Sequence, residues 1–149
     1  MKHTTSWLLL LIATGVSCKD GGIESDYSNI SDAYARWQAY NLKNYTLEQR
    51  LICFCANGGV PMKIVVRENR ILNVVNLSDG TSLPSNQWSS YKTVDELFDI
   101  TRSIKKDSVA SFRLEHDLKY GYPSILFVDP SADIADEEFG FGTENLSRN

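Results

Sequence analysis

Alternation of apolar and polar side chains is clearest between residues 45 and 75. Met62, Ile64 and Val66 would lie on one face of a strand, with Lys63, Val65 and Arg67 on the other. This period of two is typical of a sheet with one buried and one solvated face. A Gly/Pro segment at 58–61 and the pair Glu68-Asn69 interrupt the pattern and suit turns. The stretch therefore predicts three β-strands, of which the first covers residues 45–55.

A helical pattern precedes these strands. Ser31 suits the N-cap position, because a serine hydroxyl can accept a hydrogen bond from a free backbone N–H of the first turn. Ala33, Tyr34, Trp37 and Tyr40 then fall on one stripe at helical spacing. Large aromatic side chains are usually buried, so we expect Trp37 to anchor the core rather than to bind a ligand.

A second helix is predicted to begin after Thr93. Thr93 and Glu96 have the spacing of a capping box, in which each side chain accepts a hydrogen bond from the backbone N–H of the other residue. Val94, Leu97, Phe98, Thr101 and Ile104 form its apolar stripe, and Lys105-Lys106 suit the negative end of the helix dipole.

Three more strands are predicted near residues 109–116, 122–128 and 137–143. The letters around Gly59-Val60-Pro61 recur at Gly121-Tyr122-Pro123, and at the same spacing Ser31 corresponds to Thr93. We therefore expect an α+β fold in which two αβββ halves form an antiparallel sheet of about six strands, with the helices packed on one face. Residues 31–147 would make one domain with an internal repeat; a chance likeness of two hairpins is the alternative.

Residues 1–17 have the pattern of a lipoprotein signal peptide. A short positive head is followed by an apolar run of about ten residues, too short to span a bilayer. Small residues before Cys18 resemble a lipobox, although leucine is usual where Gly15 stands. We expect lipid on Cys18 and a polar tether over residues 18–30. Lys19 favours the outer membrane, and plain secretion or a retained membrane anchor are the alternatives.

Composition adds few functional hints. The 149 residues carry a net charge of −4 with scattered Lys and Arg, so we expect no nucleic-acid partner. No nucleophile elbow, phosphate-binding glycine loop or zinc-protease helix occurs in the sequence. We therefore expect neither enzymatic activity nor a cofactor.

Cys53 and Cys55 are the chemically unusual pair. Two cysteines in an exported chain would meet an oxidising compartment. Three interpretations stay open: a structural disulfide or two buried thiols, a redox-active disulfide, and a metal site completed by His116. The metal site would require the strand that carries His116 to neighbour the strand that carries the cysteines.

A run of carboxylates follows the fifth predicted strand. It comprises Asp129, Asp133, Asp136, Glu137 and Glu138. Such a loop could hold Ca²⁺, but the spacing does not follow the alternate positions of a calcium-binding loop. A solvated acidic turn is the other interpretation.

Several of these motifs occur in one order that resembles a known family. The order is Cys53-Phe54-Cys55, Val60-Pro61, the helix start at Thr93-Val94-Asp95, Gly121-Tyr122-Pro123, and Ile134 to Glu138. It resembles the domain of unknown function 6174 family, which comprises small secreted or lipid-anchored bacterial proteins. The resemblance implies an envelope location, and suggests that the cysteine pair, the Gly-Tyr-Pro turn and the acidic loop form one structural unit. It transfers no activity and no site residue.

Together these features predict a cell-envelope lipoprotein that faces the periplasm or the cell surface. Its expected role is non-enzymatic, either structural or through binding another protein of the envelope, with contact to the membrane only through the lipid. The competing hypothesis is a redox or metal-binding protein centred on Cys53 and Cys55.

Overall fold

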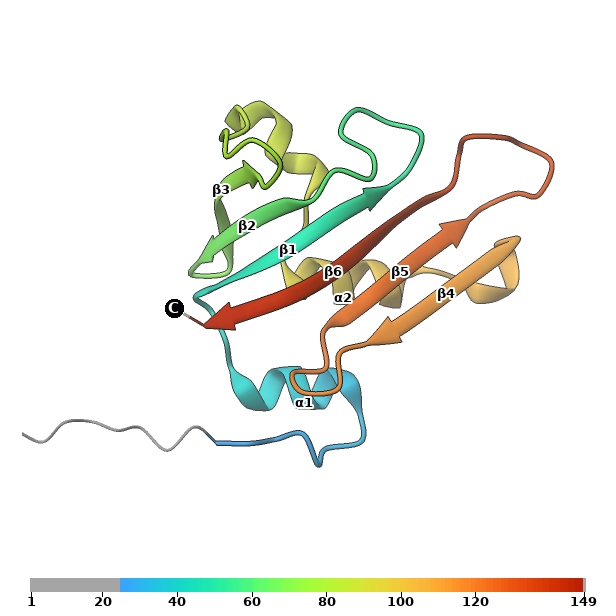
Figure 1. Ribbon diagram of the computed structural model, residues 1–149. Coiled ribbons are helices and arrows are strands. Elements are labelled where there is room, and N and C mark those ends of the chain that lie inside the picture. Colours follow the sequence, from blue (N-terminus) through green and yellow to red (C-terminus); the bar gives the residue numbers. More distant parts are fainter. Residues whose placement is uncertain (1–24, 149) are drawn as a thin grey trace, which may run out of the picture.

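The computed structural model describes residues 25–148 (Figure 1). Its helices and strands follow one another in the order helix, three strands, helix, three strands, with two short 3₁₀ helices around the second α-helix. They are α1 (Ala33–Tyr40), β1 (Tyr45–Ile52), β2 (Met62–Arg67), β3 (Arg70–Asn76), η1 (Ser85–Ser90), α2 (Val94–Ser103), η2 (Lys106–Ser108), β4 (Ser111–His116), β5 (Pro123–Asp129) and β6 (Phe139–Arg148).

Within residues 25–148 the strands form one six-stranded sheet in the order β3-β2-β1-β6-β5-β4. Every neighbouring pair is antiparallel. The last strand therefore lies in the middle of the sheet, between β1 and β5. This confirms the predicted α+β class and the antiparallel sheet of about six strands.

One face of the sheet is buried and the other is open. Leu47 of β1 pairs with Ile64 of β2, and both side chains are fully buried on the covered face. The same face carries Leu126 of β5 and Phe141 of β6, which also pair. Helix α2 lies behind the sheet in Figure 1, so the open face is turned toward the reader.

Helix α1 closes one end of the covered face. Its N-cap is Asp32, whose carboxylate accepts a hydrogen bond of 2.6 Å from the backbone N–H of Ala35, so the prediction of Ser31 as N-cap is wrong. Aspartate caps a helix at least as well as serine, and the two positions are adjacent. Trp37 is 2% exposed and meets the Tyr45 ring edge-on at 5.5 Å, which confirms it as a core anchor.

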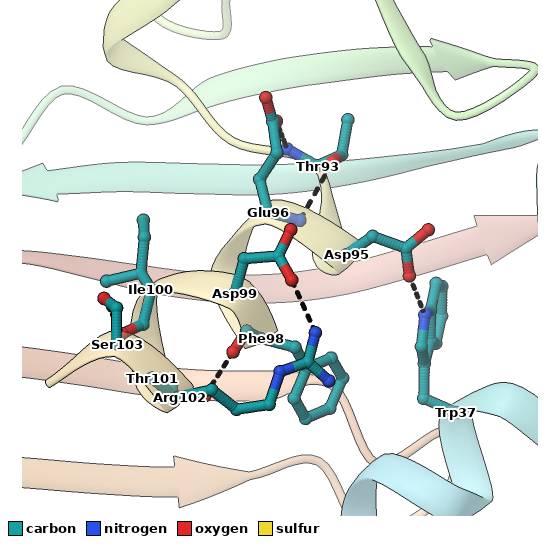
Figure 2. Close-up of polar contacts among 10 residues, drawn as sticks. All are labelled: Trp37, Thr93, Asp95, Glu96, Phe98, Asp99, Ile100, Thr101, Arg102 and Ser103. Atoms are coloured by element: carbon teal, nitrogen blue, oxygen red, sulfur yellow. Dashed lines mark hydrogen bonds and ion pairs between the residues drawn. The ribbon is translucent and has the colours of Figure 1, made fainter.

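Helix α2 begins with the predicted capping box (Figure 2). The backbone N–H of Thr93 donates to Glu96 Oε2 at 2.7 Å, and the backbone N–H of Glu96 donates to Thr93 Oγ1 at 3.3 Å. The first turn also holds α1, because Asp95 Oδ1 accepts a 2.7 Å hydrogen bond from the indole N–H of Trp37. The two helices are thus joined by a polar contact beside the core.

The chain before α1 packs on the domain. Tyr27 meets Tyr40 edge-on at 5.1 Å, and its backbone N–H donates to the Tyr40 hydroxyl at 3.1 Å. That hydroxyl in turn donates to Asp26 Oδ1 at 3.0 Å. Residues 26–30 of the predicted tether therefore belong to the folded domain. Cys18 and the predicted signal peptide lie outside the described residues.

Arg36 joins α1 to the turn between β4 and β5. Its side chain is buried, and its guanidinium donates to the carbonyl oxygens of Ile30 at 2.8 Å and Leu118 at 2.5 Å. Gly121, in the same turn, has φ +83°, and a Cβ added there would lie 2.3 Å from the carbonyl oxygen of Ala33. Helix and turn are therefore in backbone contact, with Arg36 supplying the hydrogen bonds.

The two central strands, β6 and β1, end at positions other than those predicted. β6 runs from Phe139 to Arg148, five residues further than residues 137–143 suggest. β1 ends at Ile52, so Cys53 and Cys55 lie on the turn that follows it and not on the strand. Among the described residues, none of the helices is long and apolar enough to cross a membrane.

Candidate functional site

Two glycines of β6 face the open side of the sheet. Gly142 pairs with Arg50 of β1 and with Ile125 of β5, while Gly140 pairs with Ile52 of β1 and Phe127 of β5. Paired residues on adjacent strands project to the same face of a sheet. Each glycine is therefore flanked by two larger side chains, and the row without side chains forms a trough along β6.

Close packing of the backbone explains one of these two glycines but not the other. A Cβ at Gly140 would lie 2.4 Å from the carbonyl oxygen of Leu126, so the backbone approach of β5 requires glycine there. A Cβ at Gly142 would meet no heavy atom within 4 Å. Glycine weakens a strand by about 0.5–1 kcal/mol relative to alanine, and in a strand it often marks a site of close approach. Packing within the chain does not explain Gly142.

Two hollows follow one another along this trough. The first, of about 530 Å³, is lined by Ile52, Cys53, Phe54, Phe127, Asp129, Asp136 and Glu138. The second, of about 360 Å³, is lined by Arg50, Ser124, Ile125, Gly142, Thr143 and Glu144. We call the trough with both hollows the glycine groove. At the end of the second hollow, Arg50 and Glu144 form an exposed ion pair at 3.3 Å.

The disulfide turn lies at the other end of the groove. Cys53 and Cys55 are joined by a disulfide with a Cα–Cα distance of 5.3 Å, and the Phe54 side chain between them is 81% exposed. The turn folds back on β1, since the backbone N–H of Gly59 donates to the carbonyl oxygen of Leu51 at 2.8 Å. Phe54 is therefore displayed on a cross-linked turn, which limits the conformations it can adopt.

The acidic loop between β5 and β6 forms the opposite wall. In Figure 1 this loop and the disulfide turn lie at the same end of the sheet. Asp129, Asp136 and Glu138 line the groove, whereas Asp133 is exposed outside its lining. Glu137 is half-buried, and its Oε1 has no hydrogen-bond partner within the described residues. Across residues 25–148, no three or more His, Cys, Asp or Glu side chains are grouped so that they could hold a metal ion.

His116 lies far from the cysteine pair. It ends β4, the edge strand, which is separated from β1 by β5 and β6. It pairs with Pro123 at the start of β5, and its ring stacks on Phe98 of α2 at 6.0 Å. The condition for a metal site of Cys53, Cys55 and His116 is therefore not met, because β4 and β1 are not neighbouring strands. The Gly-Tyr-Pro turn lies at the same end of the sheet as His116. Of the three parts that were expected to form one structural unit, only the cysteine pair and the acidic loop therefore lie together.

Burial lowers the pKa of His116 below its usual value of 6.5, and the nearby Arg36 guanidinium lowers the pKa further. Between the lowered pKa and 6.5 the unfolded chain binds a proton that the folded chain does not, so stability falls as pH falls through this window. We expect the melting temperature to drop as the pH is lowered through the usual histidine pKa of 6.5. His116 is the only histidine in residues 25–148. His116→Gln should therefore flatten the profile, and an unchanged slope would contradict this assignment.

The sequence patterns missed the glycine groove itself. Its one visible signal was a pair of glycines two positions apart in a predicted strand, Gly140 and Gly142. Such a pair places both missing side chains on one face. Only the central position of β6 shows that this face is open and flanked by larger side chains on both sides.

Comparison with known proteins gives a family and no function. No curated protein and no solved structure is detectably similar to the chain. A model of a family of unknown function, DUF6174, matches residues 29–148, which include both α-helices, all of the sheet and the glycine groove. The chain therefore belongs to the DUF6174 family of unknown function.

Proposed function

We propose that this protein is a non-enzymatic binding module of the bacterial cell envelope, and that the glycine groove holds an extended segment of a protein partner. The observation that carries the proposal is Gly142. It is the one groove glycine that the packing of the chain does not require, and it keeps the middle of the groove open. A strand glycine that costs stability without a packing reason is expected where another chain approaches closely.

The exposed aromatic ring of Phe54 supports the same role. Exposed apolar side chains mark interaction sites when they gather beside a concave surface with a polar rim. Phe54 stands at the mouth of the groove, next to the half-buried Ile52 and Phe127. The disulfide between its neighbours restricts Phe54 before binding, which lowers the ordering cost that a partner must overcome.

The proposed anchor is a lipid on Cys18. The protein would then be an outer-membrane lipoprotein whose domain faces the periplasm or the cell surface. The segment before α1 packs beside Tyr40, and the Tyr40 ring contacts Tyr120 in the β4–β5 turn. In Figure 1 this is the end of the sheet opposite the disulfide turn and the acidic loop. The tether would thus hold the domain with the mouth of the groove directed away from the membrane.

For the fold, we propose that the two αβββ halves have the same order of elements and similar local turns, but that they do not superpose on each other in three dimensions. Gly59 and Gly121, which precede β2 and β5, both have positive φ values, +73° and +83°. Across the sheet, β3-β2-β1 and β6-β5-β4 follow the same order, but the corresponding strands β1 and β4 run in opposite directions. Rotating one half by half a turn within the plane of the sheet would align the strand directions but would reverse the strand order. The two halves therefore do not superpose. An experimental structure whose halves superpose strand by strand would contradict this.

The binding role can be tested by photo-crosslinking in living cells that export the chain. Replacing Phe54 by benzoyl-phenylalanine keeps an aromatic ring at the mouth of the groove. The matched control carries the same residue at Leu118, which is 86% exposed but lies in the turn at the opposite end. We expect discrete adducts of protein size from position 54 and few from position 118. Equal adduct patterns from the two positions, or none from position 54, would refute the proposed role.

A further inference from the structure

We infer that the partner segment is an extended peptide with basic side chains at one end and alternating apolar side chains along its length. This inference rests on the proposed binding function and adds the chemistry of the occupant. It depends on the carboxylates at the mouth of the groove, on the apolar residues of its walls, and on the spacing of the two glycines.

The mouth of the groove is acidic and lacks basic partners of its own. Asp129, Asp136 and Glu138 come within one hollow. Among the ion pairs of residues 25–148, none joins these three carboxylates to a basic side chain. Carboxylates gathered on one wall attract lysine or arginine and disfavour an acidic occupant. A second copy of this chain, with its net charge of −4, is a poorer complement than a basic segment.

The rest of the groove is apolar and has the repeat of an extended chain. Ile52 and Phe127 flank Gly140, and Ile125 faces the Arg50 stem across Gly142. Alternate residues of a strand lie about 7 Å apart, so a segment parallel to β6 would bring its alternate side chains over Gly140 and Gly142 in turn. Apolar side chains at these alternate positions would contact the isoleucines and Phe127. A basic residue two positions further along, on the same face of the segment, would reach the acidic mouth.

Defined peptides can test this inference on protein purified from cells that express the full chain. The first probe is Gly-Lys-Lys-Leu-Ser-Leu-Gly with blocked ends, in which the first Lys and both Leu project to the same face of an extended chain. The second has Glu in place of each Lys, and the third has Ser in place of each Leu. Backbone amide shifts measured by NMR would locate each peptide, and titration would give each Kd.

We expect the Lys-Leu peptide to shift the amides of Gly142 and Ile125 but not that of Leu118. Its Kd should be about tenfold lower than the Kd of the Glu peptide, and binding should weaken with added salt. The Ser peptide should bind more weakly than the Lys-Leu peptide because it offers nothing to the apolar walls. Asp136→Asn combined with Glu138→Gln should raise the Kd several-fold. Gly142→Leu should remove the shifts, since a leucine side chain would occupy the open space.

Four results would overturn the inference. Equal or tighter binding of the Glu peptide would refute the basic occupant, and Lys-Leu binding that Gly142→Leu leaves unchanged would refute the groove as its seat. A failure of every peptide to bind, with crosslinking from position 54 intact, would refute the chemistry of the occupant while the binding function stands. Loss of that crosslinking would refute both.

Discussion

Replacing Gly121 by alanine is expected to destabilise the protein by about 3 kcal/mol, the sum of a steric and a conformational cost. The added Cβ would lie 2.3 Å from the carbonyl oxygen of Ala33 and 3.2 Å from Cβ of Arg36, so α1 would have to move away from the β4–β5 turn. The backbone φ of +83° adds strain, because a side chain in this region meets its own backbone. Chemical denaturation would measure the loss.

The matched control is Gly80→Ala. Gly80 has φ +75°, nearly the same conformation, but a Cβ there would meet no atom within 4 Å. This variant should lose only the conformational part, about 1 kcal/mol. Equal losses at the two positions would show that the contact between α1 and the turn carries no steric cost, contrary to the structure.

Replacing Arg36 by methionine is expected to cost about 3 kcal/mol or more, since several carbonyl oxygens lose their donor at once. The guanidinium donates to the carbonyls of Ile30 and Leu118, and more weakly, at 3.4 Å, to those of Ser31 and Asp117. Methionine fills a similar volume but donates no hydrogen bond. Arg36→Lys should be intermediate, because an ammonium group cannot reach all of these oxygens with the geometry of a planar fork.

Arg113→Met provides the control for losing an arginine. Arg113 lies on the open face of β4 and pairs with Glu115 at 2.6 Å, with both side chains more than half exposed. An exposed pair of this kind contributes little, so the change should stay within about 0.5 kcal/mol. If Arg36→Met were as mild as Arg113→Met, Arg36 would not be the residue that joins α1 to the turn.

Local chemistry explains which parts of the fold were predictable. The capping box needs only Thr93 and Glu96 at the right spacing, and it forms as the sequence indicates. Trp37 is large enough that burial dominates its placement. The alternation of β2 likewise identifies its buried face, because Met62, Ile64 and Val66 are all fully buried. These features depend on neighbouring residues alone.

Features set by distant residues were not predictable in the same way. β6 contains two glycines, and Asn145 has φ +54°, so its own letters do not indicate a strand that continues to Arg148. Residues 140–142 pair with both β1 and β5, and beyond Gly142 the strand continues along β1 alone. The glycine groove follows from that placement and could not be derived from one strand. Likewise, Cys53 and Cys55 read as a continuation of β1 until the backbone turns after Ile52.

The proposed binding site for the partner is the groove over Gly142. The most direct measurement is the yield of adducts from benzoyl-phenylalanine at position 54, compared between the otherwise unchanged chain and the same chain carrying Gly142→Leu. The leucine should leave the melting temperature nearly unchanged, because the space around Gly142 is open. We predict that the yield falls about tenfold, which corresponds to a loss of about 1.4 kcal/mol in binding. An unchanged yield from a stably folded variant would contradict the account.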